Sequence, residues 1–130
     1  MRRSLCLLTP VTAVLLAGVV TYSNAAKEKF IGVRAETLKI HGAVSETTAL
    51  EMAEGARRET GADYAISVTG IAGPTGGTTD KPVGTVFVGL ATPSKTIVRK
   101  YYNPYDRETF KQVTAFQALD LLRRKLAAIG

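Results

Sequence analysis

A glycine-rich stretch at residues 69–79 has the residue types of a ligand-binding loop. It reads Thr-Gly-Ile-Ala-Gly-Pro-Thr-Gly-Gly-Thr-Thr, and glycines in left-handed conformations leave backbone N–H groups uncovered for a phosphate or an oxyanion. No Gly-Lys-Ser/Thr ends the stretch, Gly-x-Gly-x-x-Gly is absent, and a strand is expected to follow, so P-loop and Rossmann geometries do not apply. Two hypotheses stay open: an anion-binding loop, or a wide turn between two strands that Lys81 and Pro82 close.

Composition excludes several other kinds of site. The single cysteine, Cys6, cannot form an internal disulfide, and together with the single His41 it leaves no cluster for structural zinc. The net charge of +6 comes from 17 Lys and Arg against 11 Asp and Glu, but the positive residues are scattered along the chain. We therefore expect no nucleic-acid-binding face, no membrane-binding face, no metal and no cofactor.

The chain has 130 residues, of which 45% are hydrophobic, so it can form one domain with its own core. Hydrophobic periodicity and turn residues predict an α/β layered domain whose sheet is mixed, because a hairpin must insert an antiparallel strand. In the last helix, Leu119 and Leu126 are among the residues predicted to face the core. The predicted helices are 25–30 (capped by Asn24), 35–40, 46–60 (capped by Ser45) and about 106–129, and the predicted strands are 64–69, 83–91 and 96–102.

Residues 1–26 fit two different structures. Arg2 and Arg3 precede an apolar run from Leu5 to Val20, and small residues follow, as in a secretory signal peptide. The part from Ala13 to Tyr22 is also typical of a buried strand with β-branched residues. Periodicity alone does not separate an export signal from a strand.

Five separated blocks of the sequence form one pattern. They are Val-Val-Thr-Tyr-Ser-Asn-Ala-Ala-Lys (19–27), Gly-Ala-Val-Ser-Glu (42–46), Met-Ala-Glu-Gly-Ala-Arg (52–57), Thr-Gly-Ile-Ala-Gly-Pro with Gly-Gly (69–77) and Lys-Pro-Val-Gly-Thr-Val (81–86). Together they resemble the C-terminal domain of the competence/damage-inducible protein CinA, the nicotinamide-nucleotide amidase family. The resemblance covers about Val11 to Leu126 and implies a single domain over residues 1–130, a three-layer α/β/α sandwich with a mixed sheet. It also implies deamidation of nicotinamide mononucleotide in pyridine nucleotide salvage, favours the strand at Ala13 to Tyr22, and suggests a cytoplasmic location.

The resemblance implies a catalytic group and a substrate-binding segment. The family uses a hydroxyl nucleophile with a lysine and a tyrosine; Lys27 and Tyr22 match the last two, and Thr12 stands where the family usually has a serine. A lysine kept neutral by burial can remove a hydroxyl proton, and a tyrosine can relay it or hold the geometry. The implied substrate-binding residues are Thr69, Gly70, Gly73, Gly76, Gly77 and, through its forked donors to a phosphate, Arg107.

The chain departs from the family at two points. The methyl group of Thr12 restricts its side chain and crowds the attack trajectory. Family members also begin with a helix, a strand and a Glu-Ser-Cys-Thr-Gly-Gly segment, which Ser4-Leu5-Cys6-Leu7 does not reproduce. Three functions stay open: an amidase acting on a nucleotide, an inactive nucleotide-binding remnant, and an exported or membrane-tethered module if residues 1–25 are a signal peptide. A homo-oligomer is one way to replace the segment.

Overall fold

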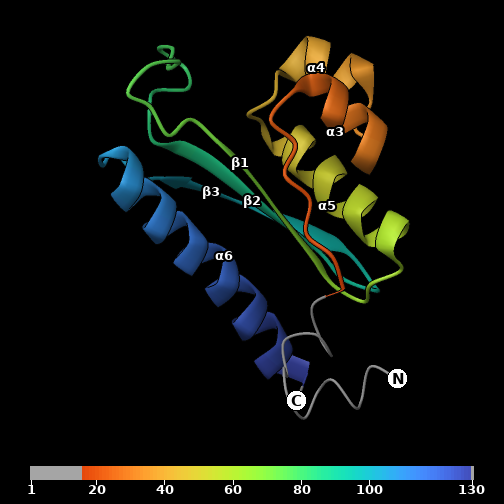
Figure 1. Cartoon of the computed structure of the whole chain (residues 1–130). Coiled ribbons are helices and arrows are strands. Elements are labelled where there is room, and N and C mark those ends of the chain that lie inside the picture. Colours follow the sequence, from red (N-terminus) through yellow and green to blue (C-terminus); the bar gives the residue numbers. More distant parts are fainter. Residues whose placement is uncertain (1–15, 130) are drawn as a thin grey trace.

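The computed structural model describes residues 16–129, which form four helices and a three-stranded sheet. Figure 1 shows α3, α4 and α5 on one face of the sheet and α6 on the other. The predicted α/β class and its three layers are therefore confirmed. The elements are α3 (Asn24–Ile31), α4 (Ala35–His41), α5 (Glu46–Thr60), β1 (Ala65–Gly70), β2 (Thr85–Ala91), β3 (Thr96–Tyr102) and α6 (Arg107–Ile129).

The strand β2 lies in the middle of the described sheet and is buried along its whole length, since helices cover both of its faces. It pairs antiparallel with β1, from Ala65 opposite Ala91 to the other end of that strand. It also pairs antiparallel with β3, where Ala91 lies opposite Thr96. The predicted β2–β3 hairpin is thus confirmed. Within residues 16–129, the three strands of the sheet run antiparallel to their neighbours.

Residues 16–22 do not form the strand that was expected from Ala13 to Tyr22. They are an extended coil in which Val19, Val20 and Tyr22 are 52%, 74% and 92% exposed. An interior strand is stabilised by ladder hydrogen bonds and by burial on both faces, and residues 16–22 gain neither from the rest of the described chain. The first part of the expected strand, like Cys6 and Thr12, lies outside the described residues.

The helix caps follow local hydrogen bonding. Ser45 caps α5 as predicted, because its Oγ accepts a hydrogen bond from Thr48 N at 3.0 Å. The prediction for α3 was wrong by one residue. Ser23 is the cap, and its Oγ accepts from Ala26 N at 3.0 Å, whereas Asn24 is already inside the helix.

The helix α6 buries a different face from the predicted one. Phe110, Thr114 and Ala118 are buried, whereas Leu119 and Leu126 are 62% and 41% exposed. One buried side chain accounts for this rotation: Asn103 Nδ2 donates to Thr114 Oγ1 at 3.2 Å, and the same amide bonds the next turn of the helix. A buried amide needs partners, so the face of α6 that carries Thr114 and Gln117 is turned toward Asn103.

The helix α5 joins the sheet to α3 and α4. Its packing face contains small residues, of which Ala49 and Ala53 are fully buried. A Cβ on Gly55 would lie only 1.6 Å from Ile31 O, so glycine is needed where α3 meets α5. No helix within residues 16–129 has the length and apolar character needed to cross a membrane.

Candidate functional site

The glycine-rich segment forms a closed loop, residues 71–84, between the end of β1 and the start of β2 (Figure 1). Two backbone hydrogen bonds close its base: Ile71 N donates to Thr85 O at 2.9 Å, and Gly84 N donates to Ile71 O at 2.7 Å. Near its tip, Thr78 N donates to Lys81 O at 2.9 Å. Residues 74–80 are exposed, so the tip of a well-anchored loop is accessible to a ligand.

Two different physical constraints, backbone conformation and close packing, explain the glycines of the loop. Gly73 and Gly76 have φ values of 77° and 101°, which L side chains rarely adopt. In addition, a Cβ on Gly73 would lie 2.4 Å from Val83 Cγ1, and a Cβ on Gly77 would lie 2.5 Å from Val83 N. Close packing of the two arms explains Gly73 and Gly77, as the wide-turn hypothesis requires. Close packing does not explain Gly76, which lies on the exposed tip and is the position best suited to an anion.

Arg107 and the glycine loop are brought together across 34 positions of the sequence. Arg107 Nη1 donates to Gly73 O at 3.0 Å from the first turn of α6. A guanidinium has five N–H donors, so this bond orients the group and leaves donors for a ligand. Asp106 accepts from Thr109 N at 3.0 Å, and the hydrogen bonds from Thr109 lower the pKa of Asp106 below its ordinary value. Both charged side chains therefore have a defined place at the start of α6.

Thr69 and Gly70 lie at the end of β1, beside the loop. Thr69 is buried, and its Oγ1 donates to Ala43 O at 2.6 Å, so its proton is used within the protein. A Cβ on Gly70 would lie 2.9 Å from Val86 Cγ2. The structure thus gives Thr69 a role in joining β1 to the segment between α4 and α5, and gives Gly70 a packing role.

Lys27 is the buried cation of α3. It is 7% exposed, and its Nζ donates to Thr21 O at 2.6 Å. Burial lowers the pKa of Lys27 below its ordinary value of 10.5, because desolvation disfavours the charged form. The sequence reason for its position is the cap at Ser23, which starts α3 so that Lys27 points inward one turn later. This is the electrostatic setting that a lysine acting as a base requires.

Tyr22, which was also expected in the catalytic group, does not lie against Lys27 in the described residues. Tyr22 is 92% exposed on the extended coil before α3, whereas Lys27 points into the protein. Thr12 lies outside the described residues. The structure therefore brings Arg107 to the loop and buries Lys27, and it leaves Tyr22 in solvent.

Lys81 makes a contact that was not predicted from the sequence. Its Nζ donates to His41 O, the last residue of α4, at 2.8 Å. From the sequence, Lys81 was expected only to close a turn. Its partner is a backbone carbonyl 40 positions away, and no local pattern of residue types marks such an acceptor.

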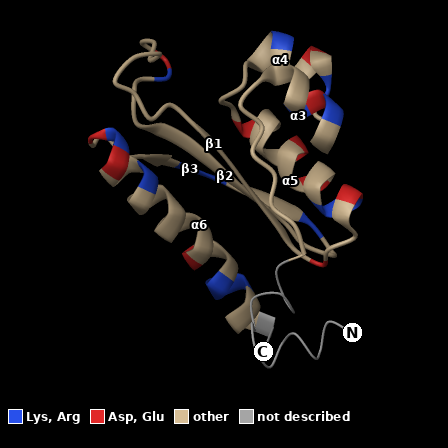
Figure 2. Cartoon of the chain, in the orientation of Figure 1, with Lys and Arg blue, Asp and Glu red and all other residues tan. Residues whose placement is uncertain are grey.

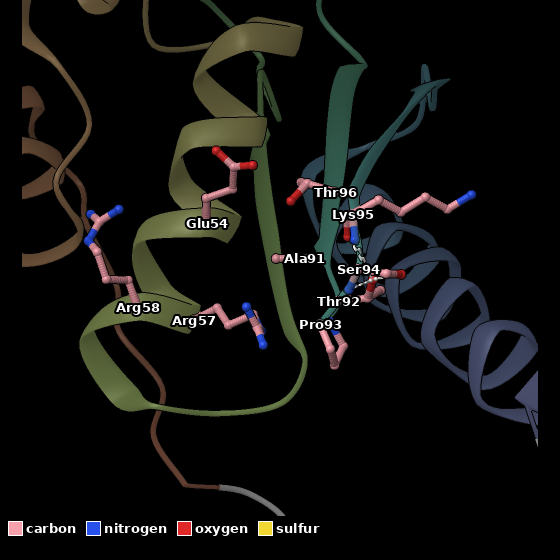
Figure 3. Close-up of a pocket in the computed structure, with 9 residues that line it drawn as sticks. All are labelled: Glu54, Arg57, Arg58, Ala91, Thr92, Pro93, Ser94, Lys95 and Thr96. Atoms are coloured by element: carbon pink, nitrogen blue, oxygen red, sulfur yellow. Dashed lines mark hydrogen bonds between the residues drawn. The ribbon is translucent and has the colours of Figure 1, made fainter.

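A hollow of about 480 Å³ lies at the other end of β2, between α5 and the β2–β3 turn (Figure 3). Figure 3 shows Arg57 pointing between the helix and the turn, whereas Arg58 and Lys95 point away on opposite sides. Arg57 is also bonded to the protein, since its Nε donates to Asp63 O at 2.9 Å. The cations do not converge on one point, so this hollow lacks the geometry of an anion site.

The charges of the described chain are distributed rather than gathered. Figure 2 shows Lys and Arg spread over the helices and the lower ends of the strands, with Asp and Glu between them. Within residues 16–129, no group of three or more His, Cys, Asp or Glu side chains could hold a metal ion. Two features of the described part are thus the best candidates for function: the glycine loop with Arg107, and the buried Lys27.

Comparison with known proteins identifies the family. A family model described as the CinA C-terminal domain matches residues 1–126. A CinA-like protein of Anaeromyxobacter dehalogenans is 53% identical over 88% of this chain and 28% of its own length. A CinA-like protein of Kosmotoga olearia is 50% identical over 89% of this chain and also 28% of its own length.

A solved structure agrees with these matches. The competence damage-inducible protein A (ComA) from Klebsiella pneumoniae, whose crystal structure is known, has 40% sequence identity to this chain. The two structures match with a TM-score of 0.87 over 96% of this chain and 78% of that chain. The chain spans just over a quarter of the length of the curated relatives that it matches. The predicted resemblance is confirmed, and the chain belongs to the CinA C-terminal domain family.

Proposed function

We propose that this domain hydrolyses the carboxamide of nicotinamide mononucleotide to nicotinate mononucleotide and ammonia. The observation that carries the proposal is Lys27, a buried lysine whose pKa is lowered by desolvation, in a motif that the family resemblance links to amide hydrolysis. An amide carbonyl resists attack by water, so the reaction needs an activated nucleophile and a group that moves protons.

Lys27 would serve as general base and then as general acid. In its neutral form the amine has a lone pair and two N–H bonds, one of which donates to Thr21 O and fixes the direction of the lone pair. The lone pair takes the proton of the hydroxyl that the resemblance assigns to Thr12, and the oxygen attacks the amide carbon. Lys27 then returns this proton to the leaving nitrogen, which departs as ammonia. Water hydrolyses the ester that remains, releases the acid and restores the hydroxyl.

The glycine loop and Arg107 would bind the phosphate of the mononucleotide. Arg107 is already oriented by its bond to Gly73 O, so little side-chain freedom is lost when its other donors bind phosphate oxygens. The exposed tip of the loop around Gly76 supplies backbone N–H groups. Binding energy from the phosphate would hold the remote amide in place for reaction.

The direct test is ammonia release from nicotinamide mononucleotide by the purified chain. We expect release by the parent and a loss of about 100-fold or more in Lys27→Met, because positioned proton transfer contributes at least this factor. Lys29→Met is the matched control, since Lys29 is exposed on the same helix and should leave the rate unchanged. No ammonia from the parent, or equal rates in the parent and Lys27→Met, would refute the proposal.

A second candidate, a nucleotide-binding domain without turnover, is favoured by the exposure of Tyr22. With that hydroxyl in solvent and Lys27 buried, a relay between the two is not formed in the described chain. Calorimetry with nicotinamide mononucleotide separates the candidates. Binding without ammonia release, weakened in Arg107→Met, supports the second candidate, and absence of binding rejects both.

A further inference from the structure

The corner between α4 and α5 at residues 41–43 is a junction where three side chains from different parts of the chain meet backbone oxygens. Carbonyls at such a corner can be satisfied by water, so side-chain partners for three consecutive carbonyls indicate a well-ordered junction. One partner comes from the end of β1, one from α5, and one from the glycine loop. The three bonds are Lys81 Nζ to His41 O at 2.8 Å, Thr48 Oγ1 to Gly42 O at 2.7 Å and Thr69 Oγ1 to Ala43 O at 2.6 Å.

Lys81 alone among these partners lies within the loop. Its backbone forms a turn with Thr78: Lys81 N donates to Thr78 Oγ1 at 3.0 Å, and Lys81 O accepts from Thr78 N at 2.9 Å. Its side chain leaves the loop and reaches the last carbonyl of α4. The C-terminal end of a helix carries partial negative charge, which favours an ammonium there. The bond is therefore charge-assisted on a half-buried side chain.

The two arms of the loop are anchored by cations from opposite directions. The arm leaving β1 is held at Gly73 O by Arg107 of α6, and the returning arm is held at His41 O through Lys81. Between these anchors lies the exposed tip, residues 74–80, which includes Gly76. Without Lys81 the tip would be fixed only at its base and by Arg107. Glycines at the tip would then give it many alternative conformations.

We propose that Lys81 is a positioning residue: its bond to His41 O holds the glycine loop in the conformation that binds an anionic group. The identity of that ligand, the phosphate of nicotinamide mononucleotide, rests on the proposed function. The role of Lys81 in ordering the loop does not rest on that function. A ligand that binds one loop conformation loses affinity in proportion to the population of that conformation, so loss of Lys81 should weaken binding and leave the chemistry at Lys27 intact.

The experiment compares Lys81→Met, Lys81→Arg and Lys39→Met in the full chain. Lys39 is exposed in the last turn of α4, so Lys39→Met removes the same charge from the same helix end without touching the loop. Amide hydrogen exchange by mass spectrometry is read in residues 74–82, with β3 as internal reference. We expect about fivefold faster exchange there in Lys81→Met, no change in Lys39→Met, and partial recovery in Lys81→Arg.

Kinetics supply the second readout. In Lys81→Met the KM for nicotinamide mononucleotide should rise about fivefold, with kcat within about twofold of the parent. Parental exchange in Lys81→Met, or the same change in Lys39→Met, would overturn the role of Lys81. Faster exchange with an unchanged KM, in a parent that turns over, would also overturn it, because the loop would then not set affinity. If the parent has no activity, the amidase proposal fails by itself, and exchange still decides whether Lys81 orders the loop.

Discussion

Glu51 of α5 braces the short helix α4, and its removal gives the sharpest stability prediction. Its carboxylate accepts from Thr37 Oγ1 at 2.7 Å, from Arg34 N at 2.9 Å and from Arg34 Nη2 at 3.0 Å. Its side chain is 12% exposed, whereas that of Arg34 is 70% exposed. One carboxylate thus ties the start of α4 to α5. We predict that Glu51→Gln destabilises the domain.

The magnitude follows from the bonds that Thr37 Oγ1 and the backbone N–H of Arg34 donate to the carboxylate. Glutamine keeps one oxygen acceptor, so the bonds from Thr37 and from the backbone of Arg34 change from charged to neutral or are lost. A hydrogen bond to a charged group contributes roughly 1 kcal/mol more than a neutral one, which gives a cost of about 2 kcal/mol for the pair. The guanidinium of Arg34 adds little, because it is exposed and solvent screens its attraction.

The dependence on pH tests the cause. Burial by itself raises the pKa of Glu51, but the hydrogen bonds from Thr37 and Arg34 and the charge of Arg34 outweigh it, so the pKa lies below the ordinary 4.5. A lowered carboxylate pKa stabilises the fold fully above the unfolded-state value, and this stabilisation is lost as the pH falls through the folded-state value. The difference between parent and Glu51→Gln should therefore be complete at pH 7 and shrink below 4.5.

Urea unfolding at a series of pH values measures this difference, with Glu54→Gln as control. Glu54 lies on the same helix and is exposed, so its substitution removes the same charge without removing the brace. A cost for Glu51→Gln that stays constant from pH 7 to below 4.5, or that Glu54→Gln reproduces, would show that the brace does not act through its charge.

Two further predictions concern α3. Gly55→Ala should destabilise the domain by about 3 kcal/mol in urea unfolding, because its Cβ would lie 1.6 Å from Ile31 O and α3 must move; a change below about 0.5 kcal/mol would contradict the close packing. Burial lowers the pKa of Lys27, so the unfolded chain binds its proton more tightly than the folded one, and stability rises with pH between the folded-state value and 10.5. The parent should therefore gain stability relative to Lys27→Met as the pH rises into this window, and a pH-independent difference would argue against desolvation of Lys27.

The sequence predicted elements whose signals are local. The helix at 46–60 and the strand at 96–102 have the predicted bounds, because Ser45 caps the helix, Gly61 ends it with φ of 70°, and the strand lies between turn residues. The family could also be predicted, since its motifs are contiguous blocks of sequence. Capping and turn chemistry are carried by adjacent residues, so sequence alone contains them.

Features decided by distant partners could not be predicted. The face of α6 depends on Asn103, a buried amide outside the helix, which overrides the leucine pattern. The apolar sequence of residues 16–22 is typical of a strand, but a strand also needs partners that the described chain does not supply. In the candidate site, the burial of Lys27 agrees with the motif, whereas the anchors of Lys81 and Arg107 are backbone carbonyls that carry no residue-type signal.

The two halves of the candidate site are mechanically one unit. Lys27 lies on α3, and the carbonyl that anchors Lys81 lies at the end of α4. Both helices are held against α5, by the close contact at Gly55 and by the carboxylate of Glu51. A substitution that loosens this packing should therefore disturb the buried base and the loop anchor together. By contrast, Lys27→Met should lower turnover and Lys81→Met should lower affinity, because each changes one half of the site. A loss of both turnover and affinity in Gly55→Ala would therefore identify a packing defect rather than a defect of the site itself.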